Sequence, residues 1–451
     1  MRSVLNRNQN ICVSFYFSPD FMIALIASPA KEKRFQQGLG PFYIAAVLES
    51  EGYEVKIFDK YDDVEESEER LDHRLALRIA QEEPSIVGVT LTTPFYRKGT
   101  RLAKYLREMI PNVLLVAGGH HATAEPVELL KNSQFDIVVV GEGETTMKEI
   151  VSTPEDLGRI KGIVYKEDGK IHVNPPRPLI QNLDNIPYPA RHLASLNDYS
   201  SDMFTGVRST SILTTRGCPY ECVYCMKTLG NELRSRSAQN VVNEIEHVIK
   251  EHDVRGFQFW DDMFGLNRDL AAQICELVTK KKINIVWWCW ADQASVDREL
   301  LQKMHDAGCR AIAFGVESVD DEVLKKAKRP LFTEQSRRAI KIAKEIGIKV
   351  HTYFTVGLPG ETEQSIQKSI EFIKETKPDR ANFSLLCPYP GTELWNRPAE
   401  LGVKITRLDN WEAYIETEVL SHEDLRNWVR KANKEVGGES LTSINSNEYV
   451  S

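Results

Sequence analysis

The sequence predicts two α/β domains in tandem, a doubly wound parallel sheet followed by a partial (β/α)6 barrel. Three observations support this fold class. At 451 residues the chain is too long for a single hydrophobic core. Short apolar runs alternate with helical stretches in two successive series, which is typical of parallel sheets covered by helices. A segment with five prolines between Pro175 and Pro189 separates the two series.

The first 21 residues come before this pattern. They are weakly apolar but lack the continuous core and the small-residue cleavage site of a signal peptide. We therefore expect residues 1–21 to be an unstructured extension, with Met22 as an alternative start.

The first series, residues 22–150, alternates five apolar runs with helical stretches. The runs are MIALIASP, EVKIFD, SIVGVTLTT, VLLVAGG and FDIVVVGEGE. Runs that are apolar throughout indicate strands buried on both faces of a parallel sheet, and ligands of such sheets lie at the carboxyl ends of the strands. Those ends are Ser28–Pro29, Asp59, Thr90–Thr92, Gly118–Gly119 and Gly141–Gly143.

Residues 151–205 are predicted to form a hairpin and a linker. GIVYKEDGKIHVN has the alternation of a hairpin that turns at Asp168 and Gly169. The proline-rich segment that follows indicates a stiff, extended connector.

The second series, residues 206–395, contains six strand–helix units. The strands are STSILTTRG, GFQFWDD, NIVWWCWAD, RAIAFGVES, KVHTYFTVG and RANFSLLCPYP. Six units are too few to close an eight-fold barrel, so we expect an open one with its active site at the carboxyl ends of the strands. Residues 396–451 are expected to be a helical segment that ends in a disordered polar tail.

The stretch RGCPYECVYC, directly after the first barrel strand, gathers Cys218, Cys222 and Cys225. Thiolates bind zinc or iron–sulfur clusters. Structural zinc takes four ligands, yet the next cysteine, Cys275, lies 50 residues further on. Three thiolates on a 4Fe-4S cluster leave one iron open. The alternative is three buried thiols without a metal. The other cysteines stand singly, which favours a reducing cytoplasm over a disulfide framework.

CPYECVYC, with Tyr224 before its last cysteine, resembles the signature of the radical S-adenosylmethionine (radical SAM) superfamily, and the resemblance extends over residues 209–394. It implies a 4Fe-4S cluster whose open iron binds S-adenosylmethionine. One electron then cleaves the sulfonium to a 5'-deoxyadenosyl radical, which abstracts hydrogen from a small-molecule substrate. The resemblance also implies a low-potential electron donor such as flavodoxin or ferredoxin.

The same resemblance implies positions for S-adenosylmethionine at the strand ends. They are Tyr224, Asp261, Asp262, Glu317, Ser318, Gly357 and Gly360. Many members carry Gly-Gly-Glu where this chain has the two aspartates, whose alternative role is to cap the helix that begins near Asn267. The glycines have a structural alternative as turn residues. Trp287, Trp288 and Trp290 are expected to divide between barrel packing and the substrate pocket.

The first domain resembles the cobalamin-binding domains that precede many radical SAM cores, through GLGPFYIAAVLESEGYEVKIFD, VGVTLTT, VAGGHHATAEP and DIVVVGEGE. The implied cobalamin positions are Thr90, Thr92, Gly118, Gly119, His121, Gly141 and Gly143. The Asp-x-His-x-x-Gly motif that supplies a histidine to cobalt is missing. His120 and His121 are therefore candidates only for contacts with the nucleotide tail, or are loop histidines that hydrogen-bond backbone. The alternative is a domain that no longer binds cobalamin and serves as a lid or partner surface.

These resemblances imply a cobalamin-dependent radical SAM enzyme that methylates an unactivated centre of a small molecule. The alternative is an oxidative cyclisation or rearrangement, as in the anaerobic chlorophyll-ring cyclases. A transfer-RNA methylthiotransferase is disfavoured because residues 22–217 contain no cysteine and because the net charge of -8 opposes nucleic acid. A non-enzymatic iron–sulfur sensor remains a further class. No apolar run reaches the roughly 18 to 20 residues of a membrane span.

Overall fold

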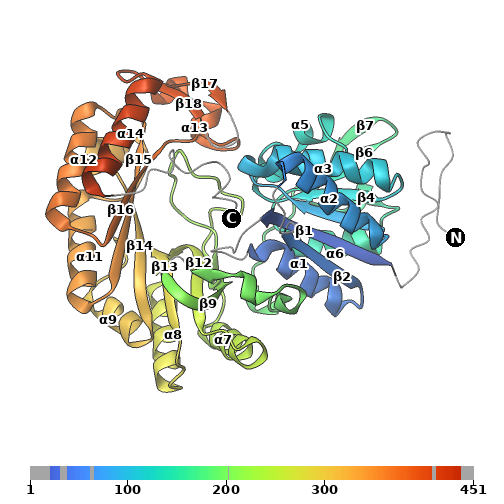
Figure 1. The fold of residues 1–451 in the computed structure, drawn as a ribbon, viewed down its shortest axis with the longest axis horizontal. Coiled ribbons are helices and arrows are strands. Elements are labelled where there is room, and N and C mark those ends of the chain that lie inside the picture. The colour runs from blue at the N-terminus through green and yellow to red at the C-terminus, as the bar shows by residue number, and fades with distance from the viewer. Residues whose placement is uncertain (1–20, 31–37, 61–65, 202, 409–412, 438–451) are drawn as a thin grey trace. The chain divides into compact units, whose positions relative to one another are not determined.

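The computed structural model describes residues 21–30, 38–60, 66–201, 203–408 and 413–437 (Figure 1). They form two compact units. The first comprises the described residues up to Gln181 and Asn185–Asp198, and the second comprises Asn182–Asp184 and the described residues from Tyr199 onward. The expected N-terminal extension, apart from Phe21, and the polar tail lie outside the described residues.

The first unit is built on a seven-stranded sheet with the order β2-β1-β3-β4-β5-β6-β7. Its five parallel strands are β1 (Met22–Ala30), β2 (Glu54–Lys60), β3 (Ile86–Thr90), β4 (Leu114–Gly118) and β5 (Ile137–Val139). The predicted doubly wound sheet is confirmed. The direction of winding changes between β1 and β3, and in such sheets ligands bind at the carboxyl ends of the strands at this point.

The predicted hairpin is present, but it belongs to the sheet and not to a linker. It consists of β6 (Ile163–Glu167) and β7 (Lys170–Val173), and it turns at Asp168 and Gly169, which both have positive φ. β6 pairs antiparallel with β5, so the hairpin extends the sheet at its edge. The boundary expected at residue 150 therefore lies later in the chain.

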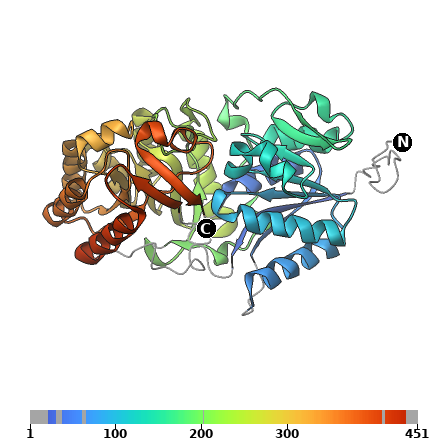
Figure 2. The ribbon, with the colours of Figure 1, turned by 90° about the horizontal axis from the view of Figure 1, so that it is seen from above.

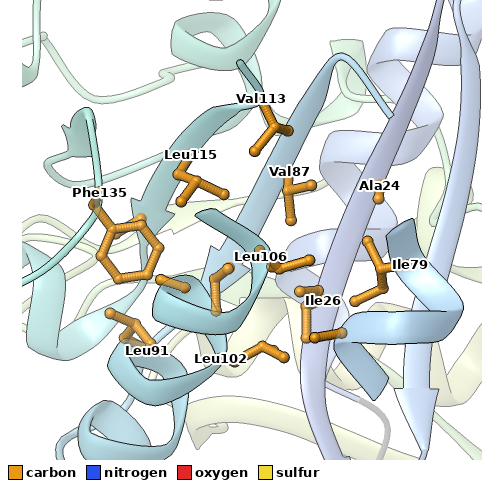
Figure 3. Close-up of a cluster of buried hydrophobic side chains, with 14 of the residues drawn as sticks. Ala24, Ile26, Ile79, Val87, Leu91, Leu102, Leu106, Val113, Leu115 and Phe135 are labelled. Atoms are coloured by element: carbon orange, nitrogen blue, oxygen red, sulfur yellow. The ribbon is translucent and has the colours of Figure 1, made fainter. Parts of the chain in front are cut away.

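Helices cover both faces of this sheet (Figure 2). One face carries α1 (Leu39–Ser50) and α6 (Glu144–Ser152), and the other carries α2 (Glu68–Gln81), α3 (Tyr96–Met109) and α5 (Pro126–Lys131). Figure 3 shows Leu102 and Leu106 of α3, four residues apart on one helix face, packed with Val87 and Leu115 of the sheet.

The second unit contains the partial barrel. Its seven-stranded sheet has the order β16-β15-β14-β13-β12-β9-β8. The six parallel strands are β9 (Phe204–Ile212), β12 (Gly256–Phe264), β13 (Val286–Ala291), β14 (Cys309–Glu317), β15 (Lys349–Val356) and β16 (Arg380–Leu385), and the short β8 (Ser200–Ser201) pairs antiparallel with β9. The six strand–helix units predicted from the sequence are confirmed.

The helices of the barrel lie along its outer side (Figure 1). They are α7 (Ala238–His252), α8 (Arg268–Lys280), α9 (Arg298–Asp306), α10 (Asp321–Lys326), α11 (Thr333–Ile346) and α12 (Glu363–Thr376). No helix within the described ranges combines the length and the apolar character needed to cross a bilayer.

The segment after residue 395 is helical only in part, which corrects our expectation. After α13 (Glu393–Asn396) the chain forms an antiparallel hairpin of β17 (Val403–Leu408) and β18 (Ala413–Thr417), followed by α14 (His422–Val436). Asn433 of α14 accepts a hydrogen bond from the amide of Phe383 at 2.9 Å and donates one to its carbonyl at 2.8 Å. α14 thus covers part of the edge strand β16.

Candidate active site

The cysteine loop projects from the carboxyl end of β9. Its two ends are held together by the short strands β10 (Thr215–Arg216) and β11 (Arg234–Ser235), which pair antiparallel. Gly217 opens the loop with a φ of +88°, and a Cβ there would clash with the carbonyl oxygen of Glu232. The sharp turn off the strand therefore requires glycine.

Within this loop Cys222 is buried, Cys218 is partly buried and Cys225 is exposed. Among the described residues, no group of three histidine, cysteine or carboxylate side chains converges on a single-ion site. In a cuboidal cluster each thiolate binds a different iron, so three ligands do not have to converge on one point as they do around a single ion. In this structure Cys222 and Cys225 are close enough to interact with each other. Three thiols in a short, pinned loop fit that donor set.

Asp261 holds the base of the cysteine loop. Its carboxylate accepts hydrogen bonds from the amides of Thr214 and Thr215, both at 2.7 Å, and from the Thr214 hydroxyl at 2.6 Å. Burial raises the pKa of Asp261 to about 6 although these hydrogen bonds oppose the shift. Asp261 is thus a positioning residue.

The neighbouring Asp262 is exposed and lies on the opposite face of β12. Neither aspartate caps α8, because the side chain of Asn267 does so by accepting a hydrogen bond from Leu270. The capping alternative that we considered for the two aspartates is therefore wrong.

A second set of bonds ties the loop to the end of β13, through residues that we did not predict. The Tyr220 hydroxyl donates to Asp292 at 3.0 Å, and Ser295 donates to the same oxygen at 2.7 Å. Asp292 is fully buried, and its other oxygen has no hydrogen-bond partner among the described residues. The sequence signal that could have identified Asp292 is its position directly after a barrel strand.

Arg329 is another site residue that sequence reasoning missed. It is buried, donates to the carbonyl of Gly315 at 3.2 Å, and lies over the ring of Tyr220 at 5.6 Å from its centroid. Its charge interacts with Tyr224, Glu317 and Cys222. A guanidinium among the cysteine loop and two strand ends provides a positive charge next to the thiols.

Glu317 and Ser318 end β14 as expected. Glu317 has a φ of +66°, which is uncommon for a residue other than glycine, and it accepts a hydrogen bond from Thr355 at 2.6 Å. Burial raises the pKa of Glu317. The Ser318 hydroxyl accepts from the amide of Asp320 at 3.3 Å.

Gly357 and Gly360 shape the turn after β15, and both have positive φ. A Cβ at Gly357 would approach Ile415 Cδ1 to 2.8 Å, so close packing against Ile415 explains why this position is a glycine. Glu361 accepts a hydrogen bond from the amide of Gly357 at 2.5 Å, and burial raises the pKa of Glu361 to about 8. The turn is thus held by a buried carboxyl group that the sequence did not single out.

The strand ends of the first unit contain both packed and open positions. A Cβ at Gly119 would approach the Leu91 carbonyl to 2.9 Å, and one at Gly143 would approach Ile44 Cδ1 to 2.9 Å. Around Gly141 nothing lies within 4 Å of such a Cβ, and at Gly118 the first neighbour is at 4.0 Å.

Two threonines stand at the end of β3, next to these glycines in the sheet. Thr92 Oγ1 is buried and has no hydrogen-bond partner within the described part of the chain, while Thr90 is partly buried. Open backbone at Gly118 and Gly141 and an unsatisfied hydroxyl fit a ligand that approaches this edge.

His121 is buried and held by side chains. Its Nδ1 lies 3.3 Å from the Thr93 hydroxyl, and its ring stacks on Tyr96 at 4.3 Å. Burial lowers the pKa of His121 to about 4, so the imidazole is neutral at pH 7. His121 thus interacts with a side-chain hydroxyl, where we expected a hydrogen bond to backbone. The neighbouring His120 is exposed.

The three tryptophans divide between the two faces of β13. Trp287 faces the helices, where its indole donates to the Ala307 carbonyl at 2.9 Å. Trp288 and Trp290 lie on the other face, together with Trp260 and Tyr353.

Comparison with known proteins gives two family matches. The B12 binding domain matches residues 35–151, and the radical SAM superfamily matches residues 212–373. An uncharacterized methyltransferase of Pyrococcus horikoshii is 34% identical over 382 residues, which is 83% of this chain and 81% of the relative. The anaerobic magnesium-protoporphyrin IX monomethyl ester cyclase of Rubrivivax gelatinosus is 29% identical over 381 residues, which is 81% of this chain and 66% of the cyclase.

Among solved structures, the radical S-adenosylmethionine methyltransferase TsrM from Kitasatospora setae shares the fold. That structure, which contains cobalamin and a [4Fe-4S] cluster, aligns with a TM-score of 0.70 at 20% identity and covers 86% of this chain and 78% of that chain.

Proposed function

This chain belongs to the radical SAM superfamily, in the group with an N-terminal B12 binding domain, and we propose that it methylates an unactivated carbon or phosphorus centre of a small molecule. The observation that carries the proposal is the cysteine loop, which Asp261 and the β10–β11 pair hold at the carboxyl end of the barrel. The similarity to the Pyrococcus methyltransferase supports methyl transfer as the reaction.

Cys218, Cys222 and Cys225 would hold a 4Fe-4S cluster, and the strand ends near Thr92, Gly118 and Gly141 would hold cobalamin. When bound, the cluster supplies the electron that cleaves S-adenosylmethionine, and cobalamin supplies a carrier for the methyl group. A low-potential flavodoxin or ferredoxin in a reducing cytoplasm is the proposed electron source.

The chain's own residues orient S-adenosylmethionine. We assign its carboxylate to Arg329, a buried guanidinium with the fork geometry that matches a carboxylate. Its ammonium is assigned to the exposed carboxylate of Asp262. Ribose hydroxyls are assigned to Glu317 and Ser318, the adenine to the turn of Gly357 and Gly360, and Tyr224 completes the contacts beside the cluster.

The assignment of Arg329 predicts a specific loss. In Arg329→Lys the charge remains but the two-pronged donor is lost, so we expect the affinity for S-adenosylmethionine to fall by about tenfold or more. Equilibrium dialysis with the reconstituted protein measures this affinity. An unchanged dissociation constant, with iron content also unchanged, would contradict the assignment.

An oxidative cyclisation is the second candidate, and the 29% identity to the Rubrivivax cyclase favours it. The two reactions differ in their products. S-adenosylhomocysteine together with 5'-deoxyadenosine indicates methyl transfer, whereas 5'-deoxyadenosine alone indicates cyclisation or rearrangement.

The proposal is tested with protein that is expressed with hydroxocobalamin and reconstituted anaerobically. We expect about four irons per chain, bound corrinoid, and 5'-deoxyadenosine after addition of dithionite and S-adenosylmethionine. Cys218→Ala should lose the iron, whereas Cys275→Ala, a buried thiol of α8, should keep it. Wild-type protein that binds no iron would overturn the proposal, and a cluster without corrinoid would restrict it to the radical SAM core.

A further inference from the structure

The inner face of the barrel has an aromatic wall. Trp260, Trp290 and Tyr353 pack with Trp288 on the side of the sheet that faces away from the helices, and these three are only partly buried. Trp260 meets Trp288 edge to face at 6.3 Å and 82°, and Trp290 meets Tyr353 at 4.6 Å. Partly exposed rings on a concave sheet offer flat surfaces for stacking.

Four polar groups stand on the same inner face. Sheet register places Gln258 beside Trp288. It places both Trp290 and His351 beside Ala313, and Tyr353 beside Asn382. Neighbours in register point to one face of a sheet, so Gln258, Trp288, His351 and Asn382 face inward from four strands.

Each of these four residues carries a buried nitrogen without a partner. Gln258, Trp288, His351 and Asn382 are exposed by 1%, 3%, 8% and 8%. The atoms Gln258 Nε2, Trp288 Nε1, His351 Nδ1 and Asn382 Nδ2 have no hydrogen-bond partner among the described residues. Unsatisfied buried polar atoms are uncommon in native proteins, and four on one face call for a shared explanation. Three are obligatory donors, and the fourth can donate in one tautomer.

The four groups are uncharged. Burial lowers the pKa of His351 to about 4, so its ring is neutral at pH 7. Lys349 and Arg380, which strand alternation places on the same face and whose charges act on His351, are exposed at the beginnings of their strands. A carboxylate or phosphate would find no buried countercharge among the four groups, whereas a carbonyl oxygen or a ring nitrogen needs only a donor.

We propose that this inner face is the substrate subsite and takes an uncharged, planar conjugated ring that presents carbonyl or ring-nitrogen acceptors. The ring would stack on the aromatic wall, and its acceptors would satisfy the buried donors. Because Trp260 and Trp290 pack against Trp288, they must turn aside when the ligand reaches the Trp288 indole. This substrate class rests on the proposed function, in which S-adenosylmethionine occupies the charged strand ends above.

The test uses three probes of similar size on the full, reconstituted chain. They are quinolin-2-one, which carries a ring carbonyl, naphthalene, which lacks an acceptor, and 2-naphthoate, which adds a charge. Saturation-transfer NMR and tryptophan fluorescence give the dissociation constants. We expect quinolin-2-one to bind at least about tenfold more tightly than the other two, as one or two satisfied donors would give.

Adjacent tryptophans provide a matched pair of variants. Trp288→Phe keeps the ring but removes the unpaired indole donor, so the preference for quinolin-2-one should shrink to about threefold or less while the unfolding temperature is maintained. Trp287→Phe should lower the unfolding temperature, because it loses the bond to the Ala307 carbonyl, and should keep the preference. Asn382→Leu is a second inner-face variant in case Trp288→Phe does not fold.

The inference is overturned if wild-type protein shows no preference among the probes, as donors satisfied by ordered water alone would predict. It is also overturned if the preference survives in both Trp288→Phe and Asn382→Leu. Reductive cleavage of S-adenosylmethionine is assayed on the same samples without a probe. Cleavage without selectivity refutes the subsite and leaves the proposed function standing, whereas selectivity without a cluster or cleavage refutes the proposed function.

Discussion

Two adjacent carboxylates of β12 have different environments, because successive side chains of a strand point to opposite faces. Asp261 is buried and accepts hydrogen bonds from the amides of Thr214 and Thr215, whereas Asp262 is exposed. In Asp261→Ala two amides and a hydroxyl lose their acceptor in a buried place, so we expect a loss of about 2–4 kcal/mol of stability and loss of iron.

Asp262→Ala is the matched control for that substitution. It should keep the iron content and the denaturation midpoint and weaken only the binding of S-adenosylmethionine. Iron assays and denaturant titration of both variants separate the two roles. Equal iron content in the two variants would show that Asp261 does not position the cysteine loop.

Glu361 gives a pH dependence with a definite sign. Burial raises the pKa of Glu361 to about 8 in the folded chain, above its usual value of 4.5. A raised carboxyl pKa means that the folded state binds the proton more tightly than the unfolded state does. The contribution of protonated Glu361 to stability is therefore complete below pH 4.5 and is lost as pH rises through 8.

Glu361→Gln should remove this dependence, because the amide resembles the protonated acid. We expect the variant and the wild type to be similar at pH 4.5, and the variant to be more stable at pH 8 by about 3–5 kcal/mol. Thermal unfolding across this range measures the difference. A constant difference at all pH values would mean that Glu361 does not titrate as described.

The candidate site was easiest to predict where its residues are neighbours in the sequence or directly follow a predicted strand. Cys218, Cys222 and Cys225 were predicted as cluster ligands from their spacing and from its resemblance to the radical SAM signature. Asp292 and Arg329 were missed because their partners are distant in the sequence: Tyr220, in the cysteine loop, is 72 residues from Asp292 in the chain. Such pairs form when parallel strands bring their carboxyl ends together. The sequence shows that Asp292 directly follows a strand, but it does not show which residues Asp292 meets there.

At the scale of elements, buried strands were the most predictable feature. Runs such as VLLVAGG are apolar throughout because both sheet faces are covered, so their extent follows from composition. The hairpin at Asp168 and Gly169 was found from its turn residues, but its pairing with β5 was not, because register between distant strands depends on tertiary contacts.

The C-terminal segment contains short strands that were not predicted from the sequence. VKITRL alternates apolar and polar residues, and its strand partner follows after a break, so the β17–β18 hairpin has little local signal. α14 was expected as a helix, but its contact with β16 was not.

That contact makes α14 a determinant of the sheet edge. Asn433→Leu has a similar volume and removes both bonds to the backbone of Phe383, so two buried backbone groups lose their partners. We expect a loss of about 2–3 kcal/mol. Asn427→Leu, on an exposed position of the same helix, is the control and should stay within about 0.5 kcal/mol. Similar denaturation midpoints for the two variants would contradict a role of α14 at this edge.

For the whole molecule, the two units should respond to acid in opposite ways. The first unit buries His121, and burial lowers the pKa of this residue to about 4. A lowered histidine pKa means that the unfolded state binds the proton more tightly, so stability falls as pH decreases from 6.5 toward 4. In the second unit the lowered pKa of His351 also makes stability fall in acid. The raised pKa values of Glu361 and Asp261, about 8 and 6, have the opposite effect and increase stability as pH falls.

Acidification from pH 7.5 to pH 5 should therefore lower the first unit's unfolding temperature, at a cost of about 1–2 kcal/mol, and leave that of the second unit equal or higher. The chain offers a convenient probe, since all seven tryptophans of the sequence fall between residues 260 and 428, and the six that the structure describes lie in the second unit. Tryptophan fluorescence then reports the second unit alone, while calorimetry reports both. His121→Gln should abolish the acid shift of the first transition and leave the fluorescence transition unchanged. If both transitions fall together in acid, and still do so in His121→Gln, the titration of His121 does not govern the first unit's stability.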